Sequence, residues 1–599
     1  MKRDMRIDLL KAIAIIAVVV YHFGWMPYGY LGVDIFLVIS GYFMMKTIQK
    51  NVNENKLSFW KYMIQRILRL LPLILVTVGI TYLLGYFLFL PESYKVLSEN
   101  GVASCLFANN LFEGLMSHNY WNLANSYKPL MHTWYVGVLM QAYAILMLIY
   151  VIVNKCSKNK MRNIKITVLI ISVVSLTLYC IPSISPSSKF YYVPFRLFEL
   201  TLGSYVATCT LKNKKLKQNF LNTIHIVCWI LLLFTFVPME VMNSRIRLLL
   251  TVVSTLGLLF YINQTKSKKN ALLNVFSLIG KASFSIYLCH QVIIAFVFSS
   301  YSDARNLKNF FIIMTMTAII STLMYHLIEK PVAKISKKMP KTSLVLNCAC
   351  CLALVGTGIK IYFDSGIVRN IPELGIVKSD YNWPKTSYNN DWSDIVYGYV
   401  NNPRTWTDDF KNDEKVKVFV VGNSYARDWA NVLNESDYAD QIQIKYFETS
   451  DNYELDIEHM KPSIKQADIV FVATEVGFSK GLDKGIPDCF INNIPKEKLY
   501  VVGDKQLGTT NNLIYSHRND HDYFNQTIKM DVELLNKNKR YANAFEDHFI
   551  DIMDYLTVDN KINIFTSDKK YISWDCRHLT VFGARYLSQI IDLSWMMEL

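Results

Sequence analysis

A serine, an aspartate and a histidine in the second half of the chain have the types and the order that nucleophilic catalysis uses. Ser424 lies in VFVVGNSYARDW, and Asp575 stands three residues before His578 in WDCRHLTVFGARYL. A histidine oriented by a carboxylate takes the proton of a serine hydroxyl, which then attacks an acyl carbon. The sequence therefore predicts a catalytic triad of nucleophile Ser424, base His578 and orienting Asp575.

Ser424 is predicted to lie where a strand ends and a helix begins, a place where helix N–H groups stabilise an oxyanion. A Gly-Asn-Ser turn at this point is equally typical of an ordinary helix N-cap. The Ser424 N–H is the one oxyanion donor that we place. Thr474, in ATEVG after the second predicted strand, stands near a further donor position without being assigned to it.

The first apolar run carries a lysine and a histidine on one helix face. Lys11 and His22 are eleven positions apart, which brings them within about 20° of one face and about 16 Å apart along the axis. Charged and imidazole side chains inside a membrane span are costly and are usually functional. The alternatives are a lysine that anchors the helix end and a histidine that hydrogen-bonds within the packing.

The elements that hold these residues are of two kinds, and the first kind is the long apolar run. Runs of this length cross a bilayer as helices, so the first part of the chain is predicted to be a polytopic membrane domain. No cleaved signal peptide is predicted, because run 9–26 lacks a small-residue cleavage site. The predicted spans are 8–27, 29–46, 69–90, 134–154, 166–183, 190–211, 219–238, 246–263, 275–298, 308–328 and 343–363.

Lys and Arg residues gather in every second connection, whereas the long loop between the third and fourth spans carries few. By the positive-inside rule these clusters and the N-terminus lie in the cytoplasm, and an odd number of spans places residues 364–599 outside. Arg196 and Glu199, one helix turn apart within a span, are predicted to form a structural ion pair.

The second kind of element is a short β-branched run. VKVFVVG (416–422), ADIVFVAT (467–474) and KLYVVG (498–503) alternate with stretches of helical spacing. This order predicts an α/β domain with a parallel sheet over residues 414–599, after a linker or cap at 364–413. Cys489 and Cys576 are the two cysteines of the polar part, and either a disulfide or two thiols fits them.

The formal net charge of +15 divides unevenly along the chain. Residues 1–363 hold 37 of the 63 Lys and Arg residues and 11 of the 48 acidic residues, so their net charge is +26 and that of residues 364–599 is −11. The positive charge belongs to the membrane part, where it marks the cytoplasmic side. We therefore predict no nucleic-acid partner.

Residues 1–335 resemble the acyltransferase-3 family of membrane O-acyltransferases. Its segments occur here in the family's order: RIDLLKAIAIIAVVVYHFG, GYLGVDIFLVISGYF, RILRLLP, PLMHTW, PFRLFELTLG, FSIYLCH and YHLIEKP. The family's HTWSLxVEEQFY segment reads HTWYVGVLMQAY, with Leu139 and Met140 in place of its acidic pair. The segments GNSYA and DxxHLT resemble the SGNH/GDSL hydrolase family, with Asn423 where Asp is usual, and many acyltransferase-3 members carry such a three-layer domain after an eleventh span.

The resemblance implies an enzyme of the bacterial cell membrane that transfers an acyl group, usually acetyl, from cytoplasmic acyl-CoA to a hydroxyl of a cell-envelope glycan such as peptidoglycan. The family's basic-x10-His motif falls on Lys11 and His22. We expect Lys11, Arg66 and Arg69 to hold the CoA phosphates and His22 to act as a general base. The donor is acetyl-CoA, no metal is predicted, and the partners are membrane lipid and the glycan.

Four hypotheses for the whole chain follow. In the leading one, the membrane part takes the acyl group from CoA and the outer domain passes it through an acyl-Ser424 intermediate to the glycan. In the second, the membrane part performs the whole transfer and the outer domain selects the acceptor. The third is an extracytoplasmic esterase. The fourth is a transporter or flippase with a glycan-binding domain.

Overall fold

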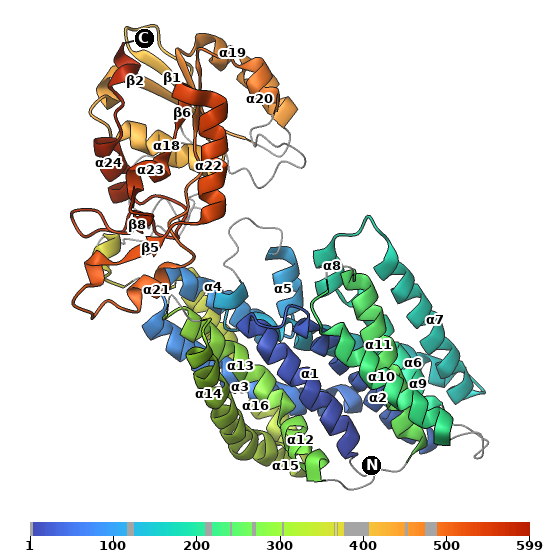
Figure 1. The fold of residues 1–599 in the computed structure, drawn as a ribbon. Coiled ribbons are helices and arrows are strands. Elements are labelled where there is room, and N and C mark those ends of the chain that lie inside the picture. Colours follow the sequence, from blue (N-terminus) through green and yellow to red (C-terminus); the bar gives the residue numbers. More distant parts are fainter. Residues whose placement is uncertain are drawn as a thin grey trace. The chain divides into compact units, whose positions relative to one another are not determined.

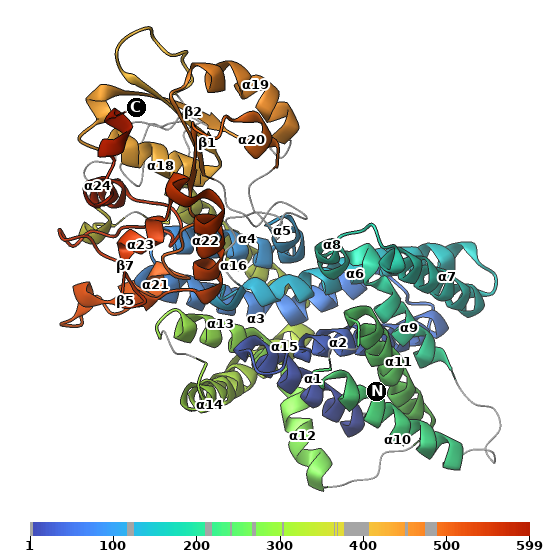
Figure 2. The ribbon, with the colours of Figure 1, turned by 45° about the horizontal axis from the view of Figure 1, so that its top comes forward.

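The computed structural model describes residues 4–116, 125–209, 218–239, 242–265, 271–301, 305–364, 366–367, 369–375, 406–449, 453–473 and 488–598 (Figures 1 and 2). The chain forms two compact units, Met1–Gly366 and Ile367–Leu599. The first is helical. The second is built on a parallel sheet.

The helical unit consists of helices joined by short 3₁₀ turns, with one π-helical segment, Tyr325–Glu329, between α14 and α15. The helices are α1 (Met5–Phe23), α2 (Gly32–Asn53), α3 (Phe59–Leu88), α4 (Pro91–Cys105), α5 (Asn109–Met116), α6 (Trp134–Cys156), α7 (Lys160–Cys180), α8 (Pro186–Tyr191), α9 (Leu197–Thr208), α10 (Gln218–Thr235), α11 (Ser244–Gln264), α12 (Ala271–Lys281), α13 (Ser283–Phe298), α14 (Leu307–Met324), α15 (Lys330–Lys338) and α16 (Pro340–Phe363).

The structure supports a membrane unit but does not confirm eleven spans. Among the described residues, seven helices are long and apolar enough to cross a membrane, and α12 with α13, bent by 65°, makes an eighth if the pair is one span. Helix α1 is not among them because Arg6, Asp8 and Lys11 all lie in its 19 residues. The predicted single span 190–211 is wrong, because α8 ends before Pro194, which removes a backbone donor, and α9 has only 12 residues.

The predicted loop between the third and fourth spans is also wrong in part, because α4 and α5 form a helical hairpin there. Helix α4 begins with Pro91 at its first position, where a missing N–H costs nothing. It runs back along α3, where the Tyr82 hydroxyl donates to the Ser98 carbonyl at 3.0 Å. At the turn of the hairpin, Gln141 Nε2 of α6 donates to the Phe107 carbonyl at 3.0 Å. Polar groups in the hairpin thus fix it to its neighbours.

Helices α2 and α9 cross at very short distance. A Cβ on Gly41 would lie 1.8 Å from the Leu200 carbonyl oxygen, so only glycine fits at this crossing. The predicted pair of Arg196 and Glu199 is confirmed, at 3.0 Å, and Arg196 Nη1 also contacts Asp34 of α2 at 2.9 Å. One guanidinium therefore ties the two helices together inside the unit.

The second unit is built on a five-stranded parallel sheet in the order β2-β1-β3-β4-β6. Its strands are β1 (Val416–Gly422), β2 (Ile442–Glu448), β3 (Ile469–Ala473), β4 (Leu499–Val502) and β6 (Phe549–Ile550). A small antiparallel sheet joins β5 (Thr527–Lys529), β8 (Lys561–Asn563) and β7 (Thr557–Val558). The three strands predicted from the sequence all belong to the parallel sheet, which confirms the α/β class.

Helices cover both faces of this sheet. Successive side chains of a strand point to opposite faces, so the apolar side chains on each face need a covering layer. On one face, Phe419 and Val421 pack in a core with Met460 of α19 (Tyr453–Gln466) and Phe490 of α20 (Asp488–Asn493). On the other face, Trp429 of α18 (Ser424–Asn434) meets Phe471 of β3, with ring centroids 5.5 Å apart. The result is the predicted three-layer arrangement.

The predicted linker 364–413 has described segments at both ends, and each bonds to the α/β unit. The Glu373 carbonyl accepts from the Tyr571 N–H at 2.8 Å, and the Trp406 carbonyl accepts from the Tyr446 N–H at 2.8 Å. Residues 376–405 lie outside the described part of the chain. The described segments 369–375 and 406–413 are therefore part of the α/β unit, whereas the linker up to Gly366 belongs to the helical unit.

Candidate active site

Ser424 is presented by a tight turn at the carboxyl end of β1. Gly422 has φ +147°, and a Cβ there would lie 1.9 Å from the Ala473 carbonyl oxygen of β3, so the turn needs glycine. The Asn423 side chain then caps α18 by accepting from the Tyr425 N–H at 3.0 Å. Because Asn423 is the cap, the Ser424 hydroxyl is left to make other contacts.

Asp575 and His578 lie in a short loop just before α24 (Val581–Ile590). The Asp575 Oδ1 atom accepts from the N–H groups of Arg577 at 2.9 Å and of His578 at 2.7 Å. This aspartate turn fixes the local conformation of the loop, and the Asn511 side chain also donates to the Ser573 and Trp574 carbonyls at 2.8 Å. Its second carboxylate oxygen, Oδ2, is directed at the His578 ring.

The three predicted residues meet as a triad. His578 Nε2 lies 2.8 Å from Ser424 Oγ, and His578 Nδ1 lies 2.6 Å from Asp575 Oδ2. Burial raises the pKa of the Asp575 carboxyl, but the charge and hydrogen bonds of His578 outweigh it, so the pKa lies below its ordinary value. An ionised Asp575 accepts only, which makes Nδ1 the donor and leaves Nε2 to accept the serine proton.

The structure does not describe the side chains of two further residues named in the sequence analysis. Thr474 lies outside the described residues, and so does the side chain of Cys489. Cys576, between the two triad members, is buried, and its Sγ donates to Asn511 Oδ1 at 3.1 Å. The Ser424 N–H remains the oxyanion donor that we assign, at the N-terminus of the 11-residue helix α18.

Sequence reasoning missed an ion pair behind the triad. Asp428, one turn after Ser424 in α18, contacts Lys505 Nζ at 2.7 Å, and both side chains are only 1% exposed. The same carboxylate accepts from the Leu579 N–H at 3.0 Å. Asp428 therefore ties the helix of the nucleophile to the residue after the base. Its helical spacing from Ser424 was visible in the sequence, but Lys505 was not predictable as its partner.

Replacing Asp428 with alanine should leave Lys505 as a buried charge without its partner. We expect the Asp428→Ala chain to lose about 3–5 kcal/mol in the free energy of unfolding of the α/β unit. Denaturant unfolding of the purified full chain, followed by tryptophan fluorescence, measures this. The double variant Asp428→Ala, Lys505→Met should recover most of the loss, and equal instability of the single and double variants would contradict the explanation.

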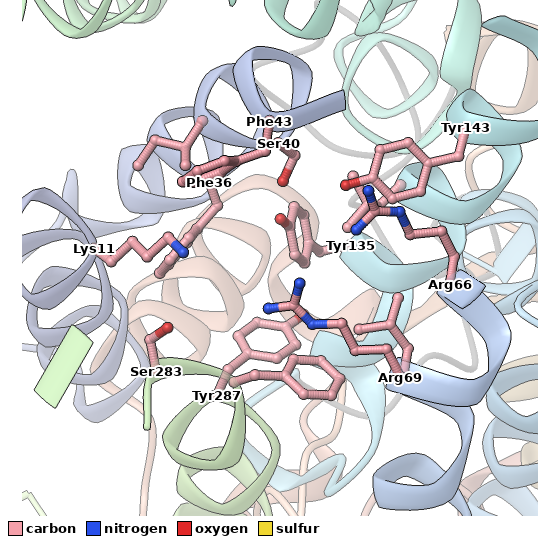
Figure 3. Close-up of a pocket in the computed structure, with 14 residues that line it drawn as sticks. Lys11, Phe36, Ser40, Phe43, Arg66, Arg69, Tyr135, Tyr143, Ser283 and Tyr287 are labelled. Atoms are coloured by element: carbon pink, nitrogen blue, oxygen red, sulfur yellow. The ribbon is translucent and has the colours of Figure 1, made fainter. Parts of the chain in front are cut away.

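In the helical unit, the three predicted basic residues surround one cavity, which we call the inner cavity. It has a volume of about 120 Å³ and is lined by Lys11, Phe36, Ile39, Ser40, Phe43, Arg66, Arg69, Leu70, Tyr135, Leu139, Tyr143, Ser283, Phe284 and Tyr287. Figure 3 shows Lys11 of α1 entering it from one side and Arg66 and Arg69 of α3 from the other. Its lining has three cations and no carboxylate. The cavity therefore suits an anionic or electron-rich group.

His22 does not line the inner cavity but is partly buried in a cluster with the buried side chains of His132 and His290. Its ring centroid lies 5.2 Å from that of His290 in α13, which lies 5.3 Å from that of His132. Tyr287 connects the two places, because its ring lines the inner cavity and its hydroxyl donates to the His132 carbonyl. Tyr287 thus contacts both the inner cavity with its basic residues and the histidine cluster.

Leu139 and Met140, which stand where the acyltransferase-3 family has its acidic pair, have different surroundings. Leu139 lines the inner cavity, whereas Met140 is buried without reaching it. Gln141 bonds to Asn110 of the α4–α5 hairpin at 2.8 Å, and the Tyr143 ring lies 5.2 Å from the Arg66 guanidinium. Leucine at position 139 therefore leaves the inner cavity without an acidic group. Among the described residues, no three His, Cys, Asp or Glu side chains are grouped to hold a metal ion.

The comparisons with known proteins concern mainly the helical unit. Residues 5–326 match the acyltransferase domain family. The chain is 30% identical over 351 residues to peptidoglycan O-acetyltransferase OatA of Listeria monocytogenes, which covers 55% of each chain. It is 29% identical over 352 residues to O-acetyltransferase OatA of Staphylococcus aureus, with 55% of this chain and 57% of that one covered. The match thus spans about half the length of these relatives.

One solved structure is similar to the second unit, namely the periplasmic domain of a lipopolysaccharide acetyltransferase from Salmonella ser. Paratyphi A. The sequence identity is 16%, the match covers 34% of this chain and 96% of that one, and the TM-score is 0.27. A score this low does not establish a common fold. The family match is different in kind, since it covers more than half of the chain, including Lys11, Arg66, Arg69 and His22. The chain belongs to the acyltransferase domain family.

Proposed function

We propose that this protein transfers an acetyl group from cytoplasmic acetyl-CoA across the membrane to a hydroxyl of a cell-envelope glycan. The observation that carries the proposal is a pair of candidate sites in one chain: a basic cavity beside buried histidines in the helical unit, and a complete triad in the α/β unit. The printed names of the relatives, peptidoglycan O-acetyltransferase among them, support the reaction class and the kind of acceptor.

In the first stage, Lys11, Arg66 and Arg69 hold the phosphates of the donor, and the thioester arm extends along the inner cavity towards Tyr287. Three cations without a carboxylate suit such an anion. His22, which contacts His290, acts as the general base that takes the proton of the group attacking the acetyl carbon. The thioester C–S bond breaks, and CoA leaves as the thiol with that proton. The distribution of Lys and Arg residues supports an entry from the cytoplasm.

In the second stage, Ser424 carries the acetyl group. Its Oγ attacks the acetyl carbon while its proton passes to His578 Nε2. The bond between the acetyl carbon and the group that received it in the first stage then breaks, and His578 gives the proton to that group as it leaves. The glycan hydroxyl then gives its proton to His578 as its oxygen attacks the ester carbon, and Ser424 takes the proton back. Asp575 stabilises the imidazolium that forms in each step.

Reconstitution tests this function directly. The full chain in sealed vesicles receives ¹⁴C-acetyl-CoA on one side and a soluble peptidoglycan fragment on the other. We expect base-labile label on the fragment only when acetyl-CoA faces the side of the lysine-rich connections. Absence of labelled glycan in every arrangement would refute the transfer, and movement of unmodified glycan without acetyl-CoA would support the flippase instead.

The esterase is the second candidate, and the same triad favours it. If it is correct, the full chain hydrolyses acetyl esters of the glycan without forming them from acetyl-CoA. Radioactive acetyl that appears on the glycan and stays there indicates the transferase and not the esterase. Transfer to glycan by a chain that ends at residue 363 would favour the hypothesis in which the outer domain only selects the acceptor.

A further inference from the structure

We infer that a phosphate site lies where α15 meets α16 and that it holds the terminal phosphomonoester of the donor's nucleotide. This rests on the proposed use of acetyl-CoA. The site is one wall of a second cavity in the helical unit, which we call the lysine chamber. The chamber has a volume of about 1040 Å³, and Lys61, Lys281, Lys330, Lys337 and Lys341 are among its lining residues.

The lysine chamber adjoins the inner cavity. Lys11, Arg69, Ser283 and Phe284 line both. Ligand pockets measure about 300–1,000 Å³, so the chamber is wide enough for a nucleotide, whereas the inner cavity, at about 120 Å³, takes only a slender arm. A wide compartment followed by a narrow one matches a donor with a bulky charged end and a thin reactive end.

The chamber has a large excess of positive charge. Lys61, Lys281, Lys330, Lys337 and Lys341 form no ion pair with a described residue, and Glu329 is the one carboxylate among the described lining residues. Glu329 accepts from Ser285 Oγ at 2.6 Å. It ends the π-helical segment, and Tyr325, which begins that segment, also lines the chamber. Single π-helical turns are frequent at functional sites.

The wall formed by α15 and α16 contains the groups that a phosphate needs. Ser336 is 8% exposed and lines the chamber, and its Oγ has no hydrogen-bond partner among the described residues. A buried hydroxyl left unpaired is costly, so an unfilled partner position points to a ligand. Lys337 and Lys341 lie next to it in sequence and line the same wall. Helix α16 starts at Pro340, and Met339 gives it no side-chain cap.

The place of this wall selects the group that it binds. Ser336, Lys337 and Lys341 line the lysine chamber but not the inner cavity, whereas Lys11 and Arg69 line both. The diphosphate, nearer to the thioester arm, therefore fits at the shared mouth. The α15–α16 wall is left for the phosphate farthest from the thioester, which in CoA is the 3′-phosphate of the ribose. A dianion there suits two lysines, a hydroxyl and a helix N-terminus.

Donors with and without that phosphate test the assignment. Rates of glycan acetylation by the full chain are measured with acetyl-CoA and with acetyl-3′-dephospho-CoA, in vesicles of neutral lipid and in vesicles that also contain anionic phospholipid. In the double variant Lys337→Gln, Lys341→Gln, we expect KM for acetyl-CoA to rise about tenfold at unchanged kcat, and KM for the dephospho donor to change less than twofold. Ser336→Ala should raise KM for acetyl-CoA about threefold.

Lys338→Gln is the matched control, because Lys338 is the exposed neighbour of Lys337 and does not line the chamber. It should leave both KM values unchanged. An equal rise of KM for both donors in the double variant would overturn the assignment, and so would an effect seen only with anionic phospholipid, which indicates a lipid phosphate as the occupant. Wild-type protein that uses neither donor would refute the proposed function, and this site with it.

Discussion

Replacing Ser424 with alanine should reduce acetylation of the glycan by at least about 10³-fold. The variant keeps His578 and Asp575 in place but has no oxygen to carry the acetyl group, and loss of a triad nucleophile costs this much or more in enzymes of this kind. The measurement is mass spectrometry of envelope glycan from cells that produce either chain at equal level. The same variant should also lose hydrolysis of a small chromogenic acetyl ester.

Ser594→Ala is a suitable control, since Ser594 is exposed near the C-terminus of the same unit and its hydroxyl donates to Asp592 Oδ1 at 2.7 Å. It should acetylate glycan at the wild-type rate. Full acetylation by the Ser424 variant would show that the acetyl group never passes through this serine. In that case the helical unit performs the whole transfer, and the α/β unit has another task.

Replacing His22 with alanine should reduce transfer from acetyl-CoA by about 10²–10⁴-fold, the usual contribution of a general base. Ester hydrolysis should not change, because His22 belongs to the helical unit and the triad to the other. Ser424→Ala and His22→Ala therefore have different signatures. The first abolishes both reactions, whereas the second abolishes only the reaction that starts from acetyl-CoA.

His225→Gln controls for the loss of any histidine in the helical unit. The His225 ring is stacked on Tyr261 at 4.2 Å and does not belong to the cluster of His22, His132 and His290. We expect it to transfer normally. A His22 variant that transfers acetyl at the wild-type rate would leave this histidine with a packing role and would move the search for a base to His132 or His290.

The triad could be predicted because its signals are local. A β-branched run that ends in Gly422-Asn423-Ser424 specifies a strand and a turn, and Asp575 and His578 are three positions apart. Each short segment folds by its own rules, and the parallel sheet brings the two together at one edge. The same reasoning could not find Lys505 behind Asp428, because 77 positions separate them and nothing in either segment refers to the other.

The number of spans was harder to predict because length and hydropathy are only part of the constraint. The α4–α5 hairpin is held by contacts of Tyr82 and Gln141, which lie on other helices. Helix α1 carries three charges and is nonetheless mostly buried, because other helices surround it. The basic clusters were interpreted as markers of the cytoplasmic side and, at Arg66 and Arg69, as ligands of CoA. That Lys61, Lys330, Lys337 and Lys341 line one chamber could not be predicted, because it depends on how distant helices pack.

The narrowness of the inner cavity has a consequence for the cell's energy supply. A passage that joins the two faces of a membrane would discharge the proton gradient if it ever filled with water along its whole length. Here the inner cavity is small, and Tyr287, which lines it, packs against His132 and His290. An acetyl group moved by successive covalent transfers needs no open pore. Under the proposed function, the acetyl group would therefore cross without a water-filled passage, and the membrane would stay electrically sealed.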